Sequence, residues 1–175
     1  MMTRVIRLAA VASLAAVPLV AQSVGTVEVG AFVRYSDFDN SLGLGNAIGV
    51  GGSGAVYVRP NLALELNVSR SANYTPVRAR LVGVLATGTR TQMLVGGGYV
   101  RNSYGGALAR SDGGVSALLG VRYRMTERVW LRAAFDADAM FSTDNSRTNP
   151  FPFYSGNWDL QLGATLRLKG GGAQQ

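Results

Sequence analysis

The sequence contains no cysteine and no histidine among its 175 residues. The missing cysteines exclude disulfide bonds and thiolate metal sites, and the missing histidines remove the commonest general base and the commonest transition-metal ligand. Lysine is nearly absent too, because 16 of the 17 basic residues are arginine. These arginines are scattered singly along the chain, so the isoelectric point near 10.4 does not indicate nucleic-acid binding.

Long apolar runs are also missing after residue 22: no stretch there reaches 18 consecutive apolar residues, which excludes a helical membrane protein. The N-terminus is different. Arg4 and Arg7 precede an alanine-rich apolar run at residues 8–21, and the polar residues Gln22 and Ser23 follow it. This pattern predicts a secretory signal peptide over residues 1–22. Its removal leaves 15 basic against 10 acidic residues, a net charge of about +5.

The clearest pattern in the chain is VWLRAAFDADAMF, at residues 129–141. Its odd positions are all apolar, whereas its even positions include Arg132, Asp136 and Asp138. A period of two is typical of a β-strand, because successive side chains leave a strand on opposite faces. We therefore predict a long strand with one apolar face and one charged face.

Segments of this kind recur along the chain, and we predict eight strands, at 26–36, 47–58, 62–71, 77–86, 91–101, 114–124, 129–141 and 158–168. The facing of the fifth strand stays open, because VGGGYV fits either face. Tight turns at 59–61, 87–90 and 125–127 alternate with longer loops, an alternation typical of outer-membrane barrels. We expect one barrel domain over residues 23–169 and a flexible tail over 170–175.

The charged side chains of the predicted strands lie opposite the aliphatic rows. They are Glu28, Arg34, Glu65, Arg78, Arg80, Arg122, Arg124, Arg132, Asp136, Asp138, Asp159 and Arg167. A soluble sandwich or a lipocalin-like barrel turns such charges toward water, whereas a membrane barrel encloses them. Enclosed charges have to pair, because a buried unpaired charge is very costly. We favour a lumen plugged by this network over a narrow, gated ion path.

Aromatic residues lie near the strand ends, and we predict that they form two interfacial girdles around an aliphatic band. Those near the short turns are Tyr57, Tyr123 and Trp130. Those near the longer loops are Tyr35, Phe38, Tyr74, Tyr99, Tyr104, Phe141 and Trp158.

Two weaker patterns bear on chemistry. Gly49, Gly51 and Gly54 match GxGxxG, but a dinucleotide site needs a helix after the glycines and a strand-like AVYV follows them. We therefore expect no cofactor. The carboxylates of Asp136 and Asp138 share a face with Arg132, so ion pairing is the simpler explanation for that pair. We assign no catalytic residue and no metal ligand.

The stretch GSGAVYVRPNLALELNVSRS, at residues 52–71, resembles the second hairpin of the eight-stranded outer-membrane β-barrel domain family typified by OmpA and OmpX. The opening VEVGAFVRYSDFDN is similar to that family's first strand and loop. The resemblance implies an all-β, eight-stranded, antiparallel up-and-down transmembrane barrel in the outer membrane. Members often end on an aromatic residue, whereas here Leu168 precedes Lys169. Barrel enzymes of this size that act on lipid A rely on a catalytic histidine, so we expect no enzymatic activity.

These observations predict a non-enzymatic outer-membrane protein that contributes to envelope integrity or to surface interaction. The expected partners are outer-membrane lipid, lipopolysaccharide and the outer-membrane assembly machinery, with no nucleic acid, and the expected state is a monomer. The loop at residues 142–157 offers Phe151, Phe153 and Tyr154 for a surface contact. The alternatives are a secreted lipocalin-like barrel that binds a small apolar ligand, and a narrow ion-conducting pore.

Overall fold

The computed structural model describes residues 23–38, 42–106, 109–141, 153–154 and 157–169, and these are almost entirely β-structure. The strands are β1 (Val27–Asp37), β2 (Ala47–Arg59), β3 (Leu62–Arg70), β4 (Tyr74–Ala86), β5 (Thr91–Tyr104), β6 (Arg110–Arg124), β7 (Val129–Phe141), the two-residue β8 (Phe153–Tyr154) and β9 (Trp158–Lys169). These residues contain no helix with the length and apolar character to cross a bilayer.

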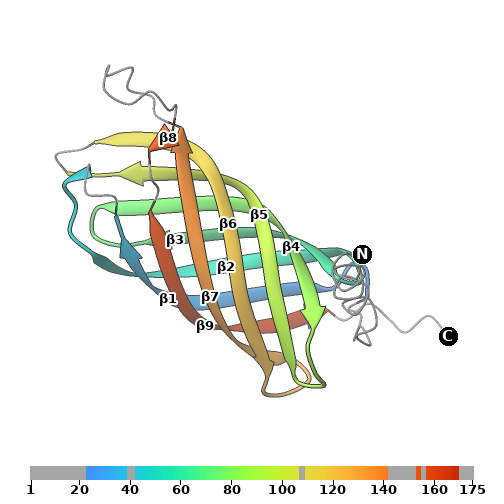
Figure 1. The fold of residues 1–175 in the computed structure, drawn as a ribbon. Helices are drawn as coiled ribbons and strands as arrows, with labels where there is room; N and C mark the ends of the chain where they lie inside the picture. The colour runs from blue at the N-terminus through green and yellow to red at the C-terminus, as the bar shows by residue number, and fades with distance from the viewer. Residues whose placement is uncertain (1–22, 39–41, 107–108, 142–152, 155–156, 170–175) are drawn as a thin grey trace, which may run out of the picture.

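The sheet closes on itself as a barrel (Figure 1). Each strand from β1 to β7 pairs antiparallel with the next, β7 pairs with β9, and β9 returns to pair with β1. β8 only extends the upper end of β7, where Phe153 pairs with Phe141. Eight strands therefore form the wall with no free edge, and the predicted up-and-down antiparallel barrel is confirmed.

Aliphatic side chains cover the outside of the barrel. Leu64, Leu131 and Leu162 are 48%, 47% and 62% exposed, whereas Glu65 and Asp136 are only 4% and 0% exposed. Period-two alternation turns one set of side chains outward and the other into the lumen. An apolar exterior around a polar interior is the arrangement of a transmembrane barrel, and it is the reverse of the lipocalin-like alternative.

The sequence left the facing of β5 open, and the burial of the residues on either side of its glycines shows it. Leu94 and Val100 point into the lumen, and Met93 and Tyr99 point outward. Gly98 lies on the inward side and pairs with Arg80 of β4. A Cβ atom at residue 98 would lie 2.5 Å from Cα and 2.7 Å from Cβ of Arg80. The glycine thus leaves the space that the Arg80 side chain needs.

The predicted strict alternation of long and short connections is wrong. The connection from β3 to β4, residues 71–73, is no longer than the tight turn at 87–90. β4 begins at Tyr74, β5 continues to Tyr104 and β6 begins at Arg110, so residues assigned to loops belong to strands. Inward and outward side chains keep alternating through these segments. The strands therefore extend beyond the predicted loop boundaries. The connections at 38–46 and 142–157 remain long.

The GxGxxG match lies wholly within β2. Gly51 and Gly49 face the lumen side of the strand, and a Cβ atom at Gly51 would lie 2.5 Å from Cζ of Phe32 on β1. The glycines permit this close approach between neighbouring strands. The strand predicted here from the sequence is present.

Candidate functional site in the barrel interior

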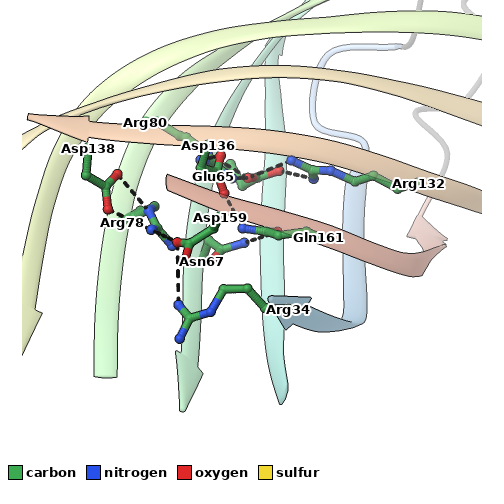
Figure 2. A network of polar contacts seen from close by, with 10 residues as sticks. All are labelled: Arg34, Glu65, Asn67, Arg78, Arg80, Arg132, Asp136, Asp138, Asp159 and Gln161. Atoms are coloured by element: carbon green, nitrogen blue, oxygen red, sulfur yellow. Dashed lines mark hydrogen bonds and ion pairs between the residues drawn. The ribbon is translucent and has the colours of Figure 1, made fainter. Parts of the chain in front are cut away.

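A network of ten polar side chains crosses the lumen (Figure 2). Four arginines and four carboxylates make it electrically balanced, and two amides join them. The members come from β1, β3, β4, β7 and β9 and are Arg34, Glu65, Asn67, Arg78, Arg80, Arg132, Asp136, Asp138, Asp159 and Gln161. All are buried except Arg132, whose side chain is 10% exposed.

Glu65 holds the middle of this network. Its Oε1 accepts hydrogen bonds from Nε and Nη2 of Arg80 at 3.0 and 2.8 Å, and its Oε2 accepts one from Nη1 of Arg132 at 2.5 Å. Arg80 also donates to Asp136 from its other terminal nitrogen, at 2.5 Å. The planar guanidinium suits such a bridge, because it presents several donors in a fixed geometry.

Arg78 organises the upper part of the network, which is the part farther from the short turns. Its Nε and Nη2 donate to the two carboxylate oxygens of Asp138 at 3.1 and 2.7 Å, and Nη2 also contacts Asp159. Arg34 lies beside this group, with Nη1 at 3.7 Å from Asp159 and its guanidinium carbon 4.7 Å from the centre of the Tyr74 ring. Gln161 extends the group around Arg80, since it donates to Asp136 and accepts from Asn67 at 3.3 Å.

A second polar group lies nearer the short turns, centred on Arg122. Its guanidinium donates to Glu28 at 2.7 Å, to Gln92 at 2.7 Å and to the Tyr57 hydroxyl at 2.8 Å. The guanidinium carbon also lies 4.6 Å from the centre of the Trp130 ring. Each nitrogen of this buried guanidinium thus donates to an acceptor, and the cation also lies against an aromatic ring.

Apolar and aromatic side chains lie on both sides of the ten-residue network. The lower cluster consists of Tyr57, Ala63, Val82, Val84, Leu94, Leu118 and Ala134. The upper cluster consists of Phe38, Leu42, Tyr74 and Tyr104. Phe38 meets Tyr74 edge-on with ring centres 4.8 Å apart, and Tyr74 stacks on Tyr104 at 5.4 Å.

The girdle prediction is therefore wrong for half of its residues. Tyr57, Trp130, Phe38, Tyr74 and Tyr104 point into the lumen and are between 2% and 7% exposed. Each occupies an inward position of its strand or of the adjoining loop, where it packs against charged or aromatic interior groups. The others, Tyr35, Tyr99, Tyr123 and Phe141, are exposed on the outer face, and Trp158 is half-buried there.

The twelve predicted charged residues all lie on the lumen side, but not all belong to the two polar groups. Arg124 is half-buried at the lower mouth, 5.9 Å from the Trp130 ring centre. Arg167 lies 3.7 Å from Glu28, and its side chain is 24% exposed. Asp112 is 1% exposed and pairs with Arg110 at 3.0 Å, and the sequence does not predict this pair because both residues precede the predicted strand at 114–124.

The predicted lumen network contained only charged residues and so left out the neutral polar side chains of the lumen. Gln92, Asn67, Asn102 and Gln161 are at most 3% exposed. Asn67 and Gln161 each lie between two outward aliphatic residues, and that signal was available in the sequence, whereas Asn102 lies between Arg101 and Ser103 and carries no such signal. The predicted loop contact is less well described: Phe151 lies outside the described residues, and for Phe153 and Tyr154 only the backbone pairing in β8 is described.

Within the described residues, no group of three histidine, cysteine, aspartate or glutamate side chains is arranged to hold a metal ion. A small cavity beside Phe32, Ser53 and Arg132 has a volume of about 10 Å³, which is about the space that one water molecule needs. The interior carboxylates are held by guanidinium groups, so the arrangement is suited to filling and cross-linking the lumen.

The closed antiparallel wall, the aliphatic exterior and the filled polar interior define an eight-stranded transmembrane β-barrel of the outer-membrane type. Solved structures support this at the level of the fold. The N-terminal barrel domain of Pseudomonas aeruginosa OprF matches with a TM-score of 0.63 and 16% identity, over 84% of this chain and 100% of that one. Neisserial surface protein A matches with a TM-score of 0.61 and 16% identity, over 82% and 96%.

The outer-membrane protein OprG from Pseudomonas aeruginosa is similar as well, with a TM-score of 0.60 and 10% identity over 85% of this chain and 98% of that one. No protein-family model and no curated protein sequence matches the chain. At these identities the likeness concerns the architecture, so the resemblance predicted from residues 52–71 is confirmed as a shared fold.

Proposed function

We propose that the chain is a non-enzymatic outer-membrane protein whose lumen is closed by its own side chains. It contributes to the integrity of the envelope or to contacts at the cell surface. The observation that carries the proposal is the balanced network of four arginines and four carboxylates, which joins five strands across the lumen.

Burial is what separates a plug from a water-filled pore. In a pore, water solvates the lining charges, so each charge need not have a protein partner. Here the side chains of Arg78, Asp138 and Asp159 are all 0% exposed, and Arg78 contacts both carboxylates directly. Such charges are stable only when they are paired, which supports a lumen filled by protein.

Catalysis is not supported by the interior groups. A general base or a nucleophile needs an available lone pair facing a substrate. The carboxylates of Glu65, Asp136 and Asp138 each accept hydrogen bonds from a guanidinium group. They therefore act as counter-ions.

The same proposal includes the orientation and the partners. The short turns face the periplasm and the longer connections face outward, as is usual for this fold. The aliphatic exterior contacts lipid and lipopolysaccharide, insertion depends on the outer-membrane assembly machinery, and the protein is a monomer. The connection at 142–157, with Phe151, Phe153 and Tyr154, offers the surface contact.

Membrane fractionation followed by gel electrophoresis tests the proposal. The protein should require detergent for extraction and should migrate differently before and after boiling, because a closed barrel resists the detergent of the gel. Recovery from the periplasm without detergent would contradict it. Planar-bilayer recording tests the pore alternative, for which steady single-channel conductance is the expected sign; the plugged lumen predicts none.

A further inference from the structure

A row of cross-strand neighbours lines one side of the lumen at its short-turn end. The register places Arg124 opposite Trp130, and Trp130 opposite Thr165. The backbone N–H of Arg124 donates to the carbonyl of Arg90 at 2.8 Å, so Arg90 is the neighbour of Arg124 on its other side. Residues directly opposite each other in an antiparallel sheet share a face, and Trp130 and Thr165 are buried on the lumen side. The whole row therefore faces the lumen.

A second row lies two residues nearer the rim. The N–H of Arg167 donates to the carbonyl of Arg128 at 2.8 Å, and Arg167 pairs with Glu28 of β1. The turns after β4 and β6, which carry Arg90 and Arg128, lie side by side at the lower end of the barrel (Figure 1). Arg128 and Arg167 are each two residues from an inward position, so they share the lumen face as well. We call the two rows the arginine mouth, with the members Arg90, Arg124, Trp130, Thr165, Arg128 and Arg167.

Positive charge in the arginine mouth is poorly compensated. Its arginines form two opposed pairs, and like charges directly opposite each other destabilise a sheet. Three of them form no ion pair within the described parts of the chain: Arg90, Arg124 and Arg128. Glu28 lies 3.7 Å from Arg167 but already accepts a hydrogen bond from another guanidinium, and Glu127 lies in the exposed turn. An anion in the mouth would relieve the repulsion between these cations.

Buried donors in the same rows have no acceptor. Trp130 is 2% exposed and Thr165 is 7% exposed, and among the described residues neither the indole Nε1 nor the Thr165 hydroxyl has a hydrogen-bond partner. The Nε of Arg167 has none either. A buried polar group without a partner in the protein is a sign of a missing water or ion. Because the Arg124 guanidinium carbon lies 5.9 Å from the centre of the Trp130 ring, the indole and the cations belong to one site.

The donors of the arginine mouth suit phosphoryl oxygens. A guanidinium group presents its N–H bonds in pairs that match two oxygens of a phosphate, and an indole N–H can only donate. Neighbouring strands are about 4.8 Å apart, so the row from Arg90 to Thr165 spans about 14 Å of the wall. Two linked phosphoryl groups fit two separate pairs of arginines better than one phosphate or one carboxylate does.

We propose that the arginine mouth binds a soluble diphosphate, inorganic or as an ester, from the aqueous side of the short turns. A soluble ligand is selected over a lipid because these donors face the lumen, whereas lipid contacts the outer face of the wall. The site lies outside the ten-residue network, so its occupation leaves the plug in place. The proposal therefore goes beyond the proposed function and does not depend on it.

The test is calorimetric titration of the folded barrel in a non-ionic detergent with inorganic pyrophosphate, at physiological ionic strength. Folding of every variant is first checked by migration with and without boiling. The unchanged protein should bind pyrophosphate saturably and more tightly than inorganic phosphate. No saturable binding, or binding that is no tighter than that of phosphate, would overturn the proposal. So would an acidic peptide that binds more tightly than pyrophosphate.

A pair of arginine variants tests the cations. Arg90→Gln/Arg128→Gln removes one arginine from each opposed pair, and both residues are exposed, so the fold should be kept. Its dissociation constant should rise about tenfold for each arginine removed, the factor expected for a hydrogen bond to a charged group. The matched control Arg70→Gln/Arg101→Gln removes exposed arginines at the opposite rim and should bind as the unchanged protein does. Equal losses in the two variants would show non-specific attraction and contradict the site.

A second pair of variants tests the neutral donors. Thr165→Val removes the unpartnered hydroxyl and should weaken pyrophosphate binding about tenfold. Thr91→Val makes the same change on the outward face near the same end and should not. In the variant Trp158→Phe, pyrophosphate should also change the fluorescence of Trp130 with the same dissociation constant. Normal binding by Thr165→Val together with unchanged Trp130 fluorescence would place the anion elsewhere and overturn the proposal.

Discussion

The interior arginines differ in the number of carboxylates that depend on them. Arg78 contacts both Asp138 and Asp159, and without it these two carboxylates would lose their closest cation. Arg34 has a longer ion pair, 3.7 Å to Asp159, and otherwise packs on the ring of Tyr74. Breaking a buried pair is costly mainly because of the charge left behind. The two arginines should therefore have unequal effects on stability.

Replacement of Arg78 by methionine should lower the free energy of unfolding by about 3–5 kcal/mol. Arg34→Met should lower it by less, because Asp159 keeps Arg78 as its partner. Urea unfolding in lipid vesicles, followed by tryptophan fluorescence, compares the two variants. Equal losses would show that the network does not depend on Arg78 as a bridge.

The two tryptophans report on the two sides of the wall. Trp130 is 2% exposed and lies inside against Arg122. Trp158 lies outside, where its ring centre is 5.8 Å from that of Tyr35 and 6.0 Å from that of Phe135. One ring is thus shielded from lipid by the barrel wall, and the other faces it.

Brominated acyl chains should quench Trp158 strongly and Trp130 weakly. Trp130→Phe and Trp158→Phe each leave one tryptophan, so the two signals separate cleanly. Fluorescence in vesicles with and without brominated lipid gives the measurement. Similar quenching of both variants would contradict the inward position of Trp130.

At the scale of single strands, glycines set how closely neighbouring strands approach. Gly98 faces the lumen across from Arg80, and a Cβ atom there would collide with Ala79 and Arg80. Gly97 faces outward, and a Cβ atom there would meet only the Ser116 carbonyl oxygen, at an ordinary 3.5 Å. Adjacent glycines in one strand therefore carry different constraints.

Gly98→Ala should destabilise the barrel by about 1–3 kcal/mol, the usual cost of overpacking. Gly97→Ala is the matched control and should change stability little. The midpoint of the temperature-dependent gel shift, measured for both variants, checks the expectation. A control as unstable as Gly98→Ala would indicate a general need for glycine in β5 instead of a local collision.

The regular strands were predictable because their alternation is strict: in β3 and β7, both faces of the structure match the pattern of the sequence. The facing of β5 was not, because Gly96, Gly97 and Gly98 carry no side chain to mark a face. The inward position of Trp130 could have been predicted, since Trp130 lies on the same face of its strand as Arg132. The girdle prediction instead followed the general preference of aromatic residues for the membrane interface. Which arginine meets which carboxylate depends on side-chain reach across the lumen, and no local pattern encodes that.

For the molecule as a whole, the lumen consists of stacked layers. The upper cluster of Phe38, Leu42, Tyr74 and Tyr104 covers the charged network, and the lower cluster around Tyr57 and Val84 lies beneath it. Each layer joins strands that are distant in sequence, such as β3 and β7 through Glu65 and Arg132. Solutes in water should therefore reach the middle of the barrel only when these layers open.

Thiol labelling measures that opening directly, because the chain has no cysteine of its own. Ser116 is 4% exposed and faces the lumen midway along β6, whereas Ser111 is exposed near the upper end of the same strand. A charged, water-soluble thiol reagent should modify Ser116→Cys about a hundredfold more slowly than Ser111→Cys, the factor that a local opening of about 3 kcal/mol imposes. Both variants should react alike in denaturant, which controls for intrinsic reactivity. Comparable rates in the folded barrel would mean that water and solutes already occupy the lumen, and the pore alternative would then replace the plug.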